Sequence, residues 1–142
     1  MITQKTICNK ENGHLIEFLE YIDGQLTTIE KYHPNGKLKY KKTPFLESYF
    51  NQDGHLHGPC RIYNEDGFLY SKQFFVNGRR HGTHFVYYTL EKSICSIENF
   101  YFGTRHGIEQ RFRPNGTLST EKIYTKDKLT SNIYFTKNGD KC

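Results

Sequence analysis

The chain has 142 residues, a formal net charge of +5 and a hydrophobic content of 35%, below the roughly 45–50% of a compact globular domain. Aromatic residues make up 15% of the chain and Ala is absent, which favours β-sheet and argues against a thick two-sided core. No apolar run approaches the roughly 20 residues that a membrane-spanning helix needs, and the modest basic charge permits an anionic partner without indicating one.

From the N-terminus onward, short aromatic and β-branched runs alternate with Asn-Gly or Asp-Gly pairs. These pairs accept positive φ at both central positions of a type I′ hairpin turn. The sequence therefore predicts an all-β fold: an elongated single-layer antiparallel meander of tandem β-hairpin repeats with about twelve strands. The pairs form two interleaved series, one with Asn12-Gly13, Asn35-Gly36, Asp66-Gly67, Asn115-Gly116 and Asn138-Gly139, the other with Asp23-Gly24, Asp53-Gly54, Asn77-Gly78, Gly103 and the Gly-less Lys126-Asp127.

We interpret residues 1–142 as one repeat domain, with partial repeats at 1–24 and 117–142. The period slips once, because Gly36 and Gly67 are 31 residues apart where neighbouring repeats are 23 apart. The extra residues lie near 41–47 and include Pro44, which lacks the amide donor that a central strand needs. We therefore expect a bulge or an excursion at this point.

Alternation along the later strand assigns side chains to the two faces of the sheet. Successive strand residues point to opposite faces. This rule predicts that Ile94 and Glu98 share one face, while Cys95 and Ile97 take the other. Neither face is wholly polar, which suits a sheet that is exposed on both sides or covered by a partner on one.

Three His-Gly pairs recur in the central repeats, at steps of 24 and 25 residues: His57-Gly58, His81-Gly82 and His106-Gly107. Each Gly is expected to leave a bare stretch of backbone that an aromatic ring covers, supplied by residues such as Tyr63, Tyr87 or Phe112. The histidines stand two strands apart, roughly 9–10 Å, whereas zinc ligands lie about 2 Å from one ion. These six positions are therefore predicted to be structural, with no metal site.

Other residue patterns that carry chemistry are weak. Cys60 and Cys95 fit half-buried strand positions, and the chain has neither a nucleophile elbow nor a phosphate-binding glycine loop. Glu109 and Glu121 could face each other across a turn, but carboxylates beside Arg and Lys in a repeat sheet usually form ion pairs. The sequence predicts no catalytic residue, no cofactor and no enzyme activity.

The recurring unit resembles a known repeat. The residues that carry the resemblance are Asn77-Gly78 followed by His81-Gly82, and the segments Asn35-Gly36-Lys37-Leu38 and Asn115-Gly116-Thr117-Leu118. The chain is similar to the variant MORN (membrane occupation and recognition nexus) repeat family, including a bacterial group labelled as antitoxin components of toxin-antitoxin systems. The resemblance implies an elongated sheet of hairpins that acts in protein interaction, membrane association or toxin neutralisation.

Surface residues provide the remaining candidate site. Aromatic and Arg side chains on a rigid surface are typical interface anchors, so we expect a protein partner such as a toxin or effector, or a scaffold role. The alternative is an acidic phospholipid surface; nucleic acid ranks below both, and open sheet edges permit self-association. Widely spaced cysteines predict reduced thiols and a cytoplasmic location. The candidate interaction residues are Arg79, Arg80, Tyr87, Tyr88, Tyr101, Arg105, Arg111, Phe112 and Arg113.

Overall fold

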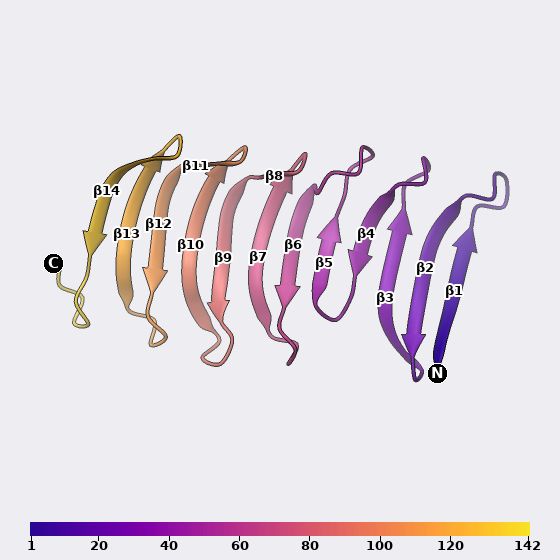
Figure 1. The fold of residues 1–142 in the computed structure, drawn as a ribbon, viewed down its shortest axis with the longest axis horizontal. Helices are drawn as coiled ribbons and strands as arrows, with labels where there is room; N and C mark the ends of the chain where they lie inside the picture. The colour runs from indigo at the N-terminus through magenta and orange to yellow at the C-terminus, as the bar shows by residue number, and fades with distance from the viewer.

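The computed structural model describes residues 1–142 as one open antiparallel sheet of 14 strands (Figure 1). Twelve strands follow one another in chain order, while the short β8 and β11 extend hairpins at β7 and β10. This arrangement confirms the predicted all-β meander. The strands are β1 (Ile2–Cys8), β2 (Leu15–Ile22), β3 (Gln25–Tyr32), β4 (Leu38–Lys42), β5 (Leu46–Tyr49), β6 (Gly58–Tyr63), β7 (Leu69–Val76), β8 (Arg79–Arg80), β9 (Gly82–Tyr88), β10 (Ser93–Tyr101), β11 (Thr104–Arg105), β12 (Gly107–Phe112), β13 (Leu118–Thr125) and β14 (Lys128–Tyr134).

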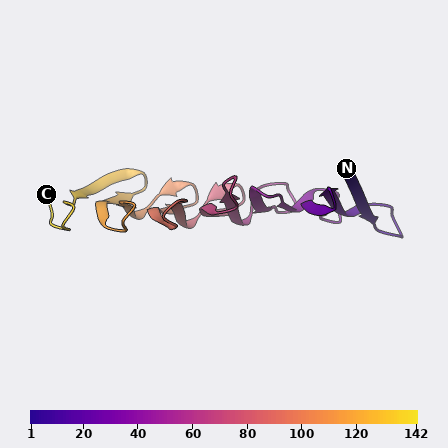
Figure 2. The same ribbon diagram turned by 90° about the horizontal axis from the view of Figure 1, so that it is seen from below.

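The sheet is a single layer, as the view along its edge shows (Figure 2). Only seven of the 142 residues are buried, so the fold has no conventional core. Five of the seven are polar or charged: Ser48, Ser71, His84, Ser96 and Glu109. Stability must therefore come from backbone ladders and from side chains that pack along each face. The chain contains no helix that could cross a membrane.

Strand register defines two faces. Ser71, Val86 and Ser96 occupy successive paired positions, and we call the side that carries them the serine face. Tyr40 pairs with Tyr49 on the opposite side, which we call the tyrosine face. The predicted position of Ile94 is wrong: a β-bulge at Cys95 places Ile94 opposite Tyr87, on the tyrosine face. An extra residue in one strand reverses every side chain beyond it.

The hairpin turns are of two kinds, not one. Asp23-Gly24 and Asn77-Gly78 have positive φ at both residues, as the type I′ prediction requires. In the other kind only the Gly is left-handed: Gly36 has φ +83°, and its N–H donates to the His33 carbonyl at 2.9 Å. That pattern is a type I turn followed by a left-handed Gly, which adds a residue to the loop.

The irregular segment near 41–47 forms a short hairpin. β4 ends at Lys42 and β5 begins at Leu46. Thr43 closes the turn, because its Oγ1 accepts hydrogen bonds from the N–H groups of Phe45 and Leu46 at 3.3 and 3.1 Å. Pro44 cannot donate to a ladder. β4 consequently pairs with only the last four residues of β3, from Ile29 to Tyr32.

Candidate interaction surface

Each central hairpin is tied to the next by the same pair of contacts. In the middle copy the Phe102 N–H donates to His81 Nδ1 at 3.3 Å, and the Gly103 N–H donates to the Arg80 carbonyl at 2.7 Å. We call this pair of contacts the turn staple. It recurs between Asn77-Gly78 and Leu56-His57, and between Lys126-Asp127 and Arg105-His106. The repeated histidines thus accept a backbone hydrogen bond, which requires an unprotonated Nδ1.

The Gly that follows each repeated His is required by backbone conformation. Gly58 and Gly107 have φ of +108° and +101°, values that residues with a Cβ rarely adopt. The prediction that the rings of Tyr63, Tyr87 and Phe112 cover these glycines is wrong. None of the three rings lies within 4 Å of the position that a Cβ would take on the Gly of any His-Gly pair. The aromatic residues paired across the ladder with Gly58, Gly82 and Gly107 are Phe75, Phe100 and Tyr124.

Four of the nine predicted surface residues gather at one long edge of the sheet. Arg79 and Arg80 form β8, Arg105 ends β11, and Tyr101 ends β10 beside them; both short strands lie at the same edge in Figure 1. The side chain of Arg79 lies against Gly103, 3.7 Å from the position a Cβ would take there. Its neighbour Arg80 lies over the ring of Phe100, with 5.3 Å between guanidinium carbon and ring centroid.

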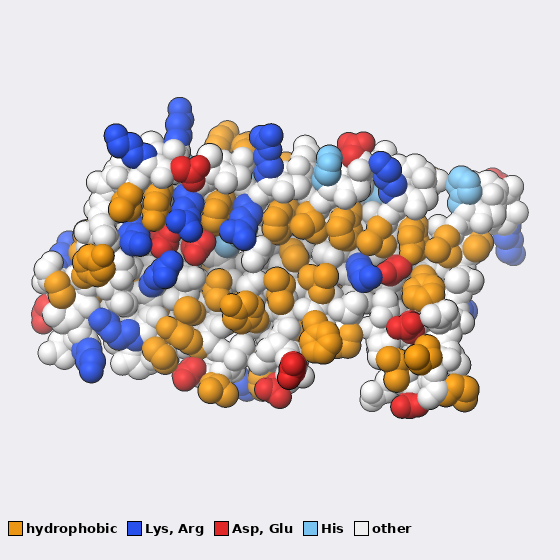
Figure 3. All heavy atoms as spheres, viewed as in Figure 1, with side chains coloured by type: hydrophobic (Ala, Val, Ile, Leu, Met, Phe, Trp, Pro, Cys, Tyr) orange, Lys and Arg blue, Asp and Glu red, His pale blue; other side chains and the backbone are white.

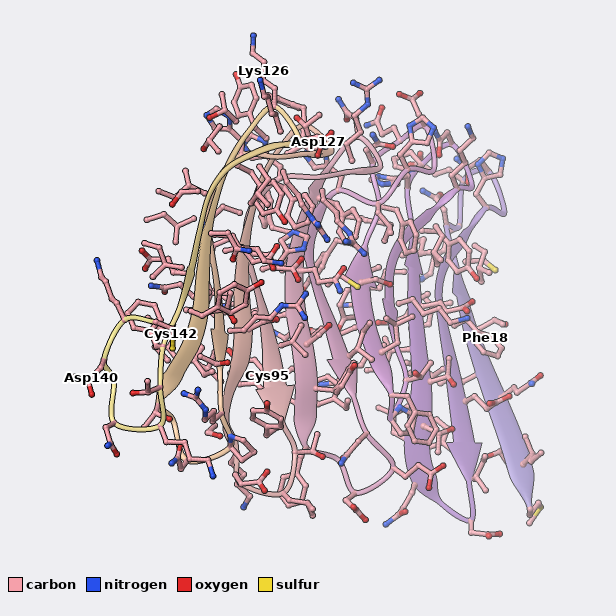
Figure 4. The ribbon with its side chains drawn as sticks, turned by 60° about the vertical axis from the view of Figure 1, so that its left-hand side comes forward. Phe18, Cys95, Lys126, Asp127, Asp140 and Cys142 are labelled. Atoms are coloured by element: carbon pink, nitrogen blue, oxygen red, sulfur yellow. The ribbon has the colours of Figure 1, made fainter.

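A fifth residue, Phe102, completes this cluster. Its ring packs edge-on against Tyr101 at 4.9 Å between centroids and against His81 at 4.5 Å. Tyr101 and Phe102 remain 59% and 44% exposed. We call the set the aromatic–basic rim, and it consists of Arg79, Arg80, Tyr101, Phe102 and Arg105. Lys126 projects from the same edge at the β13–β14 turn (Figure 4).

Phe102 was not among the residues predicted from the sequence, although a signal was present. The first turn residue is Asp23 or Asn77 in two other copies, and those residue types tolerate left-handed backbone. Phe102 adopts φ +45°, an uncommon conformation for a bulky residue that is held only where its surroundings enforce it. A Phe at an Asn position was therefore the clue.

The other five predicted residues lie toward the opposite long edge, so the nine predicted residues do not form one surface. Tyr87 and Tyr88 line a hollow of about 280 Å³ with Phe68 and Lys92. The hydroxyl of Tyr88 donates to the Phe112 carbonyl at 3.0 Å. Arg113 is occupied by backbone, because its guanidinium donates to the carbonyls of residues 118 and 135 at 2.8 and 2.6 Å.

Arg111, the ninth predicted residue, belongs to a charged cluster on the serine face. Its Nε donates to Glu109 at 3.2 Å, and Lys122 and Arg105 approach the same carboxylate at 4.0 Å. Figure 3 shows Lys, Arg, Asp and Glu side chains gathered over β10, β12 and β13. The suggested pairing of Glu109 with Glu121 is wrong, since the register sets Glu109 opposite Lys122 and puts Glu121 on the tyrosine face.

His84 is the buried titratable group nearest the rim. Its ring packs between Phe75 and Phe100, at 6.0 and 4.8 Å between centroids, and its Nε2 lies 3.1 Å from the Phe74 carbonyl oxygen. Burial lowers the pKa of His84 below its ordinary 6.5; the Phe74 contact opposes this shift, and the charge of Arg80 lowers the pKa further by a smaller amount. The imidazole is thus neutral at physiological pH.

This lowered pKa predicts acid destabilisation. Below about pH 6.5 the unfolded chain gains a proton at His84 that the folded chain resists, so the free energy of unfolding falls with decreasing pH by up to about 1.4 kcal/mol per pH unit. Urea unfolding at about pH 7.5 and pH 5 should show this loss for the natural chain and a smaller loss for His84→Gln. Equal losses in both proteins would contradict the assignment.

Two segments of the chain match a known family model. Residues 27–45 and 105–126 match the MORN repeat variant; they lie at β3–β4 and β11–β13 and cover less than half of the chain. MORN repeats are commonly modules that bind proteins or membranes and are generally non-catalytic, which agrees with a non-enzymatic repeat protein. No protein of curated function matches the chain significantly.

Proposed function

We propose that the chain is a non-enzymatic repeat protein that binds an acidic surface of a partner protein through the aromatic–basic rim. The observation that carries the proposal is Phe102, a half-exposed aromatic residue at φ +45° in a tight turn. A non-Gly residue held in such a region costs about 1–3 kcal/mol. Two other turns of this kind place Asp23 and Asn77 there, residue types that tolerate the conformation, while Lys126 adopts it at φ +49°. Strain that burial does not offset is typical of a binding position.

The surroundings of Phe102 fit a protein interface. Aromatic and Arg side chains contribute most of the binding energy in many protein complexes, because they exclude water around a few buried contacts. The turn staple fixes the backbone of Phe102 and Gly103, so little conformational entropy is lost on binding. Arg79, Arg80 and Arg105 lie at the same edge as the two rings, and their positive charge would steer an acidic partner.

Capture from host extract tests the proposal. We expect the natural chain to retain a protein that Tyr101→Ser retains at least about ten-fold less, because the truncation removes an interface ring. Tyr70→Ser is the matched control, since Tyr70 is also a half-exposed strand tyrosine, 49% accessible. Quantitative mass spectrometry compares the proteins retained by the natural chain and by the two variants. Identical sets for all three proteins would contradict a role for the rim.

An acidic phospholipid surface is the second candidate. It is favoured by the arrangement of Arg79, Arg80, Arg105 and Lys126 along one edge, with exposed rings between them. Sedimentation with phosphatidylserine vesicles at low and moderate salt separates the two candidates. Salt-sensitive binding that is lost in Arg79→Glu would support the lipid candidate over the protein partner.

The identity of the partner is a further part of the proposal. The resemblance to antitoxin-like MORN variants supports a toxin or effector as the partner, or a scaffolding role. The four cysteines are unpaired, which supports a location in the cytoplasm. Co-expression with a toxin encoded beside this chain would test neutralisation: growth should be rescued by the natural chain and not by the Tyr101→Ser variant.

A further inference from the structure

The sheet contains a notch between β3 and β4. β3 has eight residues, but β4 pairs with only the last four, so residues 25–28 have β2 on one side and no strand on the other. A hollow of about 240 Å³ lies there, lined by Leu26, Thr27, Ile29, Lys42, Thr43 and Pro44. Figure 3 shows an indentation of the lower margin at this place. Unpaired strand backbone offers donors and acceptors to an added strand.

The notch opens onto the largest hollow of the molecule. This second hollow, about 570 Å³ on the tyrosine face, shares Leu26 and Ile29 with the notch and adds Leu19, Tyr40 and Tyr49 to its wall. The hydroxyl of Tyr40 is satisfied, because it donates to Glu47 at 3.1 Å. Burial and this bond raise the pKa of Tyr40 to about 12. The wall is therefore apolar and uncharged at Tyr40.

The margin of the two hollows carries unpaired positive charge. Glu17 and Lys31 neutralise each other at 3.7 Å. Lys39 on one hollow and Lys42 on the other form no ion pair. An occupant must therefore combine apolar side chains for the wall with acidic side chains for the two lysines.

We infer that the notch binds an extended acidic and apolar segment of a partner protein, added as a strand along the free edge of β3. Four residues of β3 offer about 13 Å of ladder at about 3.3 Å per residue, so a segment of about four residues fills the edge. Main-chain hydrogen bonds supply affinity, and alternate side chains enter the hollow and meet Lys39 and Lys42. The inference rests on the chain being a protein-binding module, but not on the rim.

A second copy of this chain does not fit the notch. Its two open edges are β1 and β14, and neither strand contains an acidic residue. Both carry a lysine instead, Lys5 and Lys128, which would repel Lys39 and Lys42. Charge therefore favours a foreign acidic segment over self-association here.

Two short synthetic peptides test the inference by fluorescence anisotropy: one carries Glu and Val on the same face of the strand, with Thr between them, and the other carries Lys and Val at those positions. We expect the Glu–Val peptide to bind at least about ten-fold more tightly, and Lys39→Glu combined with Lys42→Glu to reverse the order. Backbone N-methylation of the peptide should abolish binding, because an added strand needs its N–H groups. Hydrogen exchange should show new protection at residues 25–28.

Matched variants locate the site. Leu26→Ser should weaken the Glu–Val peptide about ten-fold, whereas Leu129→Ser should not, although Leu26 and Leu129 are equally accessible at 46% and 45%. Tyr101→Ser should leave peptide binding unchanged, which separates failure of the notch from failure of the rim. Absence of binding, equal binding of both peptides, or equal effects of the two Leu variants would overturn the inference.

Discussion

Replacing Phe102 with Asn is expected to stabilise the fold and to weaken partner binding in the same protein. Asn adopts left-handed backbone more readily than Phe, so the substitution removes most of the roughly 1–3 kcal/mol of backbone strain. It also removes ring contacts with His81 and Tyr101, which are worth about 0.5–1.5 kcal/mol. The free energy of unfolding should therefore rise by about 1 kcal/mol, while partner capture falls at least about ten-fold.

Urea unfolding and quantitative capture measure the two effects in the same preparation. Asn77→Phe is the mirror control, because it places a Phe at the equivalent turn position of the preceding hairpin. It should destabilise the fold, through strain and through loss of the bond from Asn51 at 2.9 Å, and it should leave partner capture unchanged. A Phe102→Asn protein that is less stable than the natural chain would show that ring packing outweighs the strain.

Replacing Gly107 with Ala is expected to lower the free energy of unfolding by about 2 kcal/mol. Gly107 has φ +101°, beyond the left-handed region that other residues tolerate, and an added Cβ would lie 3.5 Å from Asn99 Cβ. Gly82→Ala is the matched control at the same repeat position. Its φ is +73° and nothing lies within 4 Å, so it should cost only about 1 kcal/mol.

The ranking of the two Gly variants separates two explanations of the His-Gly repeat. If backbone conformation requires the Gly, then Gly107→Ala destabilises the sheet more than Gly82→Ala does. A ring packed over each Gly would predict similar losses at both positions. Chemical denaturation with unchanged m-values is the appropriate measurement, because a changed slope would mean that the unfolded or native state had altered as well.

Much of the fold could be predicted because its information is local. Turn residues and a regular period indicate where each strand begins and ends. Because the turns are short, consecutive strands must pair with each other. Register is less local: one extra residue at Cys95 moved Ile94 to the other face. No pattern in the strand marks that bulge, since Ile94, Cys95 and Ser96 are all acceptable strand residues.

The candidate surface was predictable only in part, for a geometric reason. Tyr87 and Arg105 belong to neighbouring repeats, yet they lie toward opposite ends of their hairpins, and a strand of 7 residues such as β9 spans about 23 Å. Residues of neighbouring repeats are therefore not always close together in space. The acceptor role of His81 was also hidden, because it depends on how one hairpin stacks on the next.

The turn staple joins each central hairpin to its immediate neighbours and to nothing more distant, in the manner of a one-dimensional array. A pull on the two ends of the chain would accordingly peel hairpins from the ribbon one after another, and each stapled hairpin would release its own His contact. Whole hairpins can also be gained or lost by duplication or deletion without disturbing those that remain, so the length of the ribbon is free to follow the size of whatever it binds.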